Sequence, residues 1–129
     1  MAIRSSSSPE EDADILEECR DYGEDLTKPL AITHFFSLPL MPGPEPRDAV
    51  KALKSRSRRV VWDEEIAGDG HWHVGAFTTG LLTLDNMAEG RAEMESLAKA
   101  HGLVYGGWAR TRTGEEERRL NAWRKRGKK

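Results

Sequence analysis

The chain has 129 residues, a usual length for one domain, and 33% of them are charged against 37% hydrophobic, which indicates a soluble domain with a modest core. No apolar run approaches the length of a transmembrane helix, and the N-terminal residues MAIRSSSSP lack the apolar stretch of a secretion signal. The single cysteine, Cys19, excludes an internal disulfide and fits a reducing cytoplasm.

The formal net charge of −2 hides a segregation of charge along the chain. Residues 10–25 contain nine acidic residues and one basic residue. Residues 47–59 contain six basic residues and one acidic residue, and residues 110–129 contain nine basic residues and three acidic residues. Such blocks either present two surfaces of opposite field or neutralise one another in the fold, and the pattern leaves both interpretations open.

The N-terminal part predicts a flexible leader over residues 1–8 and then an acidic helix. Ser8 is a suitable N-cap, Pro9 suits the first helical position, and Gly23 ends the helix. Apolar residues recur between them at helical spacing, at Ile15, Leu16, Cys19 and Tyr22.

A strand, a helix and a second strand are predicted next. Residues 30–38 are rich in β-forming residues and are closed by Pro39. Three prolines and a glycine predict a loop over residues 40–46. Residues 48–55 follow as a short helix with Ala49, Val50 and Leu53 directed inward, residues 59–66 as a strand, and Asp69-Gly70 as a hairpin turn.

The C-terminal half predicts strand, helix, strand and helix. A strand is expected over residues 71–84, bent at Gly80, and a helix from Asp85 or Asn86 to Gly102. That helix has one side formed by Met87, Met94, Leu97, Ala98 and His101. A last strand over residues 103–111 and a charged helix over residues 115–126, anchored by Leu120 and Trp123, complete the chain, with a mobile tail from residue 124.

This order predicts an α+β fold. The central β-α-β-β-α-β series matches the ferredoxin-like plan, an antiparallel four-stranded sheet with two helices on one face. An extra N-terminal helix and a basic C-terminal helix flank it. We therefore expect one domain over residues 9–112, preceded by the leader and followed by a helix or tail over residues 113–129.

The last strand contains an unusual sequence, Tyr105-Gly106-Gly107-Trp108. Alternation along a strand places Tyr105 and Gly107 on one face and Gly106 and Trp108 on the other. Glycine inside a strand usually marks a bulge or a close neighbour. A core tryptophan beside a tight contact between helix and sheet explains the pattern from local considerations alone.

The run LAKAHGLVYGGW, residues 97–108, resembles the end of the RraB family of ribonuclease E inhibitors, which typically shows Tyr-Asp-Gly-Trp after its second long helix. Gly106 stands here where the family often has Asp. Residues 23–26, 32–36 and 73–85 are also similar to the family's acidic-helix turn, first strand and third strand with helix entry. The resemblance covers roughly residues 10–110.

The resemblance implies a ferredoxin-like domain without catalysis that binds ribonuclease E through the enzyme's non-catalytic scaffold part. The family tends to be acidic overall, whereas this chain is nearly balanced and has a basic tail over residues 118–129. This departure leaves the particular partner and the binding surface open. As contact candidates we name the acidic helix and the surface around the signature: Glu11, Asp14, Glu17, Glu18, Asp21, Tyr105 and Trp108.

Other kinds of site have weak support in the sequence. His71 and His73 share a strand face and could meet His34, but two or three histidines without a nearby cysteine or carboxylate are too few for a zinc site. Cys19 lies among acidic residues that would raise its pKa, which favours a buried structural thiol. The acidic residues 63–65 resemble a solvated turn, and no hydrolase or nucleotide-binding motif occurs. We predict no catalytic residue, no metal and no cofactor.

RNA binding is the alternative function. A ferredoxin-like sheet can stack bases on exposed aromatic residues, and Phe35, Phe36 and Phe77 are candidates, with the basic blocks available for phosphates. Alternation places Phe35 and Phe77 on one sheet face and Ile32, Phe36, Trp72 and Val74 on the other. Two helices cover one face only, so the other face is covered by the acidic helix, by the tail helix through Trp123, by a second subunit or by a partner.

Overall fold

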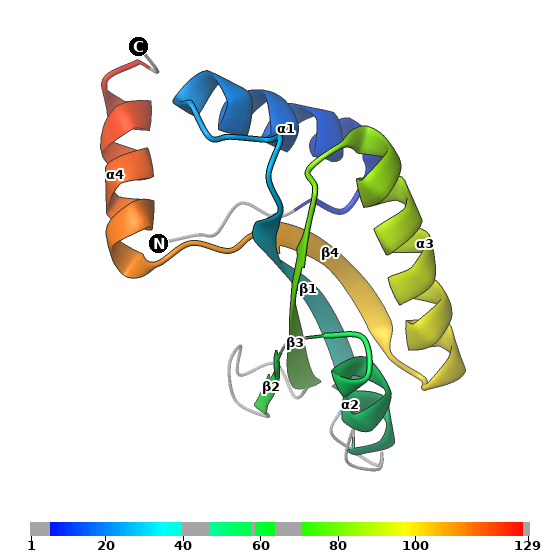
Figure 1. The fold of residues 1–129 in the computed structure, drawn as a ribbon. Helices are drawn as coiled ribbons and strands as arrows, with labels where there is room; N and C mark the ends of the chain where they lie inside the picture. The colour runs from blue at the N-terminus through cyan, green and yellow to red at the C-terminus, as the bar shows by residue number, and fades with distance from the viewer. Residues whose placement is uncertain (1–5, 40–46, 58, 64–70, 128–129) are drawn as a thin grey trace.

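The computed structural model describes residues 6–39, 47–57, 59–63 and 71–127 (Figure 1). These residues form four helices and one four-stranded sheet. The predicted loop over residues 40–46 and the turn at Asp69-Gly70 lie outside the described residues. The elements are α1 (Pro9–Tyr22), β1 (Leu30–Pro39), α2 (Arg47–Lys54), β2 (Arg59–Asp63), β3 (His71–Gly80), α3 (Leu84–Ala100), β4 (Val104–Arg110) and α4 (Gly114–Lys125).

The sheet confirms the predicted α+β fold. Its strand order is β2-β3-β1-β4, and each neighbouring pair is antiparallel. This is the order of the ferredoxin-like plan, with β1 and β3 in the centre and β4 at one edge. Because β4 is an edge strand, it has one side available for pairing with another segment of the chain.

The register between β1 and β3 determines which side chains face the helices. Phe36 pairs with Val74 and His34 pairs with Ala76, and all four are buried on the helix-covered face. In Figure 1, α2 and α3 lie along this side, and α1 lies across the end of α3. One apolar cluster joins α2 and α3 to the sheet, and a second joins α1 to Ile32, Leu82, Met87 and Trp108.

Local capping explains where the first helix begins and ends. The Ser8 side chain accepts a hydrogen bond from the backbone N–H of Glu11, as expected of an N-cap, and Pro9 follows it. Gly23 ends the helix with φ of +95°, a left-handed conformation that favours glycine. The predicted helix over residues 9–22 is confirmed.

The third strand and the following helix correct the sequence prediction in two respects. The strand ends at Gly80 instead of continuing to residue 84, and the helix begins at Leu84 because the Thr83 side chain caps it by accepting from the N–H of Asn86. His101, predicted on the buried side of this helix, is exposed in the cap position.

Helix α4 is held against the C-terminal part of α1 (Figure 1). A capping box between Thr113 and Glu116 begins the helix, and the predicted anchors Leu120 and Trp123 are buried. The ring centroids of Tyr22 and Trp123 lie 5.0 Å apart. The predicted helix over residues 115–126 is confirmed, and because it continues through Arg124 and Lys125, the tail predicted from residue 124 does not begin there.

Candidate functional site

A bulge in β4 places both aromatic residues of the signature on the same side of the sheet. Phe36 of β1 pairs with Tyr105, Phe35 pairs with Gly107, and the register shifts between these two pairs. Gly106 is therefore the extra residue of the bulge. The strict alternation predicted from the sequence is wrong at this point, because the inserted residue turns Trp108 onto the helix-covered face together with Tyr105.

Gly107 makes room for the N-terminal segment. The backbone of Ser6 forms an isolated antiparallel bridge with Trp108, with its N–H donating to the Trp108 carbonyl at 2.6 Å and its carbonyl accepting from the Trp108 N–H at 2.9 Å. A Cβ on Gly107 would lie 2.0 Å from the Ser6 carbonyl oxygen, and φ of Gly107 is +107°. Ser6 is fully buried, so the predicted flexible leader does not extend to this residue.

The indole of Trp108 is fully buried and binds α1 through Asp12. The Trp108 Nε1–H donates to Asp12 Oδ1 at 2.8 Å, and the same oxygen accepts from the Ser6 hydroxyl and from the Arg91 guanidinium of α3. Asp12 is 2% exposed. One carboxylate oxygen thus connects the N-terminal segment, α1, α3 and β4.

The charge of Asp12 is maintained by its hydrogen bonds. Burial by itself raises the pKa of this carboxyl, but the hydrogen bonds from Arg91, Ser6 and Trp108 outweigh burial and place the pKa below its ordinary value. The Arg91 side chain is 11% exposed and forms an ion pair with Asp12. The network is therefore a buried charge pair with additional neutral donors.

His34 and Tyr105 form a second buried contact beside this network. The His34 Nδ1 and the Tyr105 hydroxyl share a hydrogen bond of 2.7 Å, and Tyr105 also packs against Phe36 with ring centroids 5.3 Å apart. Burial and, to a smaller extent, the charge of Arg91 lower the pKa of His34 to about 4. Burial also raises the pKa of Tyr105. Both side chains are neutral in the folded protein at physiological pH.

The low pKa of His34 predicts a pH dependence of stability. The unfolded chain protonates this histidine near pH 6.5, whereas the folded protein does so near pH 4. The contribution of His34 to the free energy of unfolding is therefore fully present above about pH 6.5. It decreases by about 3 kcal/mol as the pH falls to about 4. We expect His34→Asn, whose amide can replace Nδ1, to flatten this part of the curve in urea titrations.

A matched control is His101→Asn, since His101 is exposed. This control should keep the wild-type dependence between pH 6.5 and 4. If His34→Asn and His101→Asn give the same curve as the wild type, His34 does not titrate as its burial predicts.

An ion-pair cluster connects the end of α1 to the end of β4. Glu24, directly after the Gly23 cap, accepts from Arg110 Nε at 2.8 Å and from Arg112, whose Nε lies at 3.1 Å. These three side chains are between 8% and 13% exposed. Together with the Glu18–Arg124 ion pair to α4, the cluster shows that part of the C-terminal basic block neutralises the acidic block.

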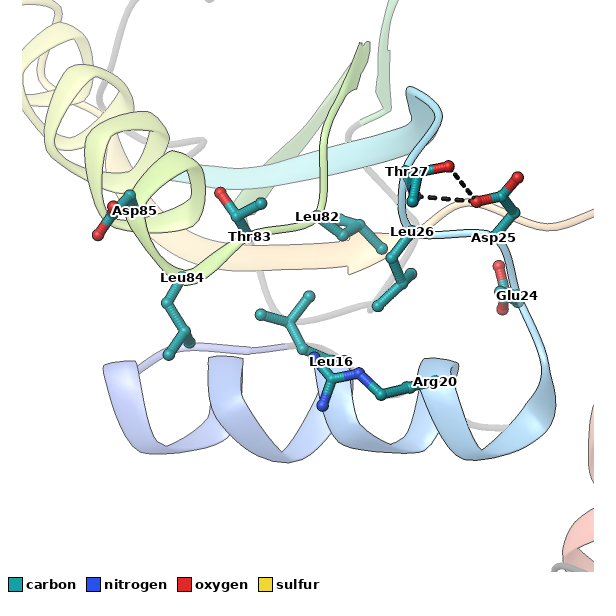
Figure 2. Close-up of a pocket in the computed structure, with 10 residues that line it drawn as sticks. All are labelled: Leu16, Arg20, Glu24, Asp25, Leu26, Thr27, Leu82, Thr83, Leu84 and Asp85. Carbon is teal, nitrogen blue, oxygen red and sulfur yellow. Dashed lines mark hydrogen bonds between the residues drawn. The ribbon is translucent and has the colours of Figure 1, made fainter.

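A groove of about 610 Å³ lies between α1, the segment after it and the beginning of α3 (Figure 2). In Figure 2, Leu16, Leu26, Leu82 and Leu84 approach one another in this groove. Leu84 is 54% exposed and Leu26 is half-buried, whereas Leu16 and Leu82 are only 4% and 3% exposed, so Leu84 and Leu26 supply the apolar surface that solvent can reach. The lining residues are Leu16, Arg20, Glu24, Asp25, Leu26, Thr27, Leu82, Thr83, Leu84 and Asp85.

Carboxylates are arranged along the rim of the groove. The Thr27 hydroxyl donates to Asp25 Oδ1 at 2.5 Å and the Thr27 backbone N–H donates to the same oxygen at 3.0 Å, and these hydrogen bonds, the first more than the second, lower the pKa of Asp25. Asp85, in the first turn of α3, is exposed on the other side. The groove therefore combines an apolar floor with negative charge, and Arg20 is the basic residue in its lining.

The structure places the predicted contact residues in three different environments. Glu11, Asp14, Glu17 and Asp21 are exposed on α1, while Glu18 is 8% exposed and pairs with Arg124. Tyr105 is half-buried and Trp108 is fully buried. The exposed carboxylates lie on the side of α1 turned away from Asp12, Ile15 and Cys19.

The structure does not bring the histidines together. His34 faces the helices, whereas His73, from the register of β3, lies on the opposite sheet face and lines a hollow there. Among the described residues, no group of three or more histidine, cysteine or carboxylate side chains could hold a metal ion. Cys19 is 1% exposed, and burial followed by the charge of Glu24 raises the pKa of its thiol, as expected of a structural cysteine.

The comparison with protein families connects this geometry to a function. A family model described as regulator of ribonuclease activity B matches residues 9–109, which include α1, the groove, the sheet up to Ala109, and Asp12, Arg91 and Trp108 of the buried network. The chain belongs to the RraB family. No curated protein matches the chain. The match to the RraB family covers all the elements of the ferredoxin-like core.

RraB membership makes the protein a non-catalytic regulator of ribonuclease E activity that acts by interaction with the enzyme. No helix in the described part of the chain is long and apolar enough to cross a membrane. Asp12, Arg91 and the groove were not predicted as functional features from the sequence. Helical spacing contains a signal for the first two, because Asp12 lies three residues before Ile15 and Arg91 lies between Met87 and Met94 on the same helix side.

Proposed function

We propose that the exposed acidic side of α1 and the adjoining leucine groove form the surface through which this regulator binds ribonuclease E. The observation that carries the proposal is the Trp108–Asp12 hydrogen bond, which fixes α1 on the sheet from a residue of the family signature. Trp108 and Glu18 support this surface from within, whereas Tyr105 contacts His34 and Phe36 beside the Trp108 network. Because α1 is already ordered, little conformational entropy is lost when the partner binds.

The chemistry of the surface favours one kind of partner segment. The accessible leucines, Leu26 and Leu84, suit one or two apolar side chains, and the carboxylates of α1 and the groove rim suit lysines or arginines beside them. We propose that the scaffold part of ribonuclease E supplies a segment of this kind, apolar at its centre and basic at its flanks. Its affinity should decrease as the salt concentration rises, because the charge pairs are exposed.

Reversal of charge on α1 tests this surface. We expect the double variant Glu17→Lys/Asp21→Lys to bind the ribonuclease E scaffold about tenfold or more weakly at low salt, because two exposed carboxylates become cations facing a basic segment. Glu18 stays unchanged because its ion pair with Arg124 holds α4. Isothermal titration calorimetry measures the affinity, and cleavage of an RNA substrate measures the inhibition.

The matched control is Asp48→Lys/Glu93→Lys, which alters the net charge equally but lies on α2 and α3, and it should bind as the wild type does. In the same assay, Leu84→Gln should weaken binding without lowering the melting temperature, because this side chain is already half in solvent. Equal affinity of the two double variants at low salt would remove α1 from the binding surface.

Three further assignments belong to the same proposal. The regulatory domain comprises residues 9–112 and is followed by residues 113–129, of which α4 (Gly114–Lys125) docks on it. The protein works in the cytoplasm, where it meets ribonuclease E. A homodimer is not required, because the proposed surface is formed by one chain.

A further inference from the structure

The sheet face opposite the helices has an accessible aromatic centre. Phe35 of β1 and Phe77 of β3 lie on this face and line a hollow of about 240 Å³, together with Thr33, Val61 and Gly75. A second hollow of about 220 Å³ shares Phe35 and Phe77 and extends to the end of β4 and the first turn of α4. In Figure 1, α4 stands at the end of the sheet beside α1, so it does not lie across these strands.

The strand register explains the hollow. Phe35 lies opposite Gly75, and Thr33 lies opposite Phe77, so the two rings are diagonal neighbours on the two central strands. Gly75 contributes no side chain between them, and the nearest atoms to a Cβ built there are 3.6 Å away or more. The result is a shallow depression with an aromatic residue on either side.

A cation stands beside the rings. The guanidinium carbon of Arg59, an exposed residue of β2, lies 5.8 Å from the centroid of the Phe77 ring. Arg110 and Arg112 line the second hollow, where Glu24 and Glu117 pair with them. The acidic side of α1 lies on the other side of the sheet. Its negative field therefore repels a polyanion less on this face than on the helix-covered face.

We propose that this sheet face binds single-stranded RNA, with bases stacked against Phe35 and Phe77 and a phosphate near Arg59. Aromatic residues at the centre of an antiparallel sheet stack unpaired bases in RNA-binding domains of this plan. The two small hollows suit separate planar groups better than the broad apolar contact of a stable protein interface. The site is independent of α1, so the regulator could contact the enzyme and its RNA substrate with opposite faces.

Fluorescence anisotropy with a labelled single-stranded RNA of about 12 nucleotides tests the proposal. The wild-type chain should bind it more tightly than duplex RNA, with an affinity that decreases as salt rises. The variants Phe35→Leu and Phe77→Leu keep an apolar side chain but remove the stacking surface, and each should weaken binding about tenfold. Arg59→Gln should reduce the salt dependence, whereas Lys51→Gln, an exposed cation on α2, should leave binding unchanged.

Melting temperatures of the leucine variants establish that each remains folded, and Gly75→Val, which fills the depression, gives a second way to block the site. No binding of single-stranded RNA by the wild type at low salt would overturn the proposal. So would an equal effect of Lys51→Gln and Arg59→Gln. If the chain forms dimers that Gly75→Val dissociates while RNA does not bind, the face is a protein interface and the RNA proposal is wrong.

Discussion

Replacement of Asp12 by alanine is expected to lower the free energy of unfolding by about 4 kcal/mol. The buried oxygen of Asp12 accepts from Arg91, Ser6 and Trp108. Alanine leaves the Arg91 guanidinium, with a side chain 11% exposed, without its counter-ion. An uncompensated buried charge is more costly than the loss of the hydrogen bonds themselves. Urea unfolding followed by tryptophan fluorescence measures the change.

Two further variants separate charge from hydrogen bonding at this position. Asp12→Asn keeps an acceptor for Trp108 but removes the negative charge, so we expect a loss smaller than that of alanine. Asp14→Ala removes an exposed carboxylate two residues along the same helix and should change stability by less than about 0.5 kcal/mol. Equal stability of Asp12→Ala and Asp14→Ala would show that the buried network does not hold α1.

The same residue predicts a second pH-dependent step. The folded-state pKa of Asp12 lies below 3.8, because its hydrogen bonds outweigh the effect of burial. Its contribution to stability is therefore present above about pH 4 and is lost as the pH falls through the folded-state pKa. The contribution of His34 to stability is lost between pH 6.5 and about 4. The two groups thus destabilise the protein in successive pH ranges, and the Asp12→Asn and His34→Asn variants should each remove one of them.

Most of the fold could be predicted from local sequence signals. Ser8, Pro9 and Gly23 define α1 through backbone chemistry that acts within a few residues. Apolar periodicity identifies α2 and α3, and two apolar anchors in a charged segment indicate α4. The end of β3 was the main error. Leu81 and Leu82 in residues 81–83 led to the prediction of a continuing strand. In the structure, the cap formed by Thr83 starts α3 at Leu84. A hydrogen bond from one capping side chain can favour a helix start over continued strand pairing, and the spacing of apolar residues contains no information about this competition.

The candidate site could be predicted only in part. Acidic residues in α1 look alike in the sequence, yet Asp12 is buried in a network and Glu18 pairs with Arg124, while Glu17 is exposed. These differences arise from partners distant in the sequence, since Trp108 and Arg124 reach α1 only after the chain folds. The groove is likewise formed by three segments that no local pattern joins.

The paired glycines have different functions that the sequence alone did not separate. Gly106 is the extra residue of the bulge, and the nearest atom to a Cβ built there is 3.5 Å away. Gly107 has positive φ and lies against the Ser6 backbone. A side chain would therefore meet no close contact at Gly106, whereas at Gly107 it would clash with the Ser6 backbone.

Substitution of Gly107 by alanine is therefore expected to lower the free energy of unfolding by about 3 kcal/mol. A methyl group would lie 2.0 Å from the Ser6 carbonyl oxygen and would impose strain at φ of +107°. The bridge between Ser6 and Trp108 must then open, which also removes the Ser6 hydroxyl from Asp12. Urea unfolding measures the stability, and limited proteolysis measures the release of the N-terminal segment.

Gly106→Ala is the matched control, because it makes the same change one residue earlier at a position without positive φ or a close contact. This control should stay within about 1 kcal/mol of the wild type and keep its N-terminal segment protected. The bridge model also predicts that a chain lacking residues 1–7 tolerates Gly107→Ala better, because the clash with Ser6 is absent and only the backbone strain remains. If Gly107→Ala lowers the stability of the full chain and of the shortened chain equally, contact with Ser6 is not the reason why position 107 requires glycine.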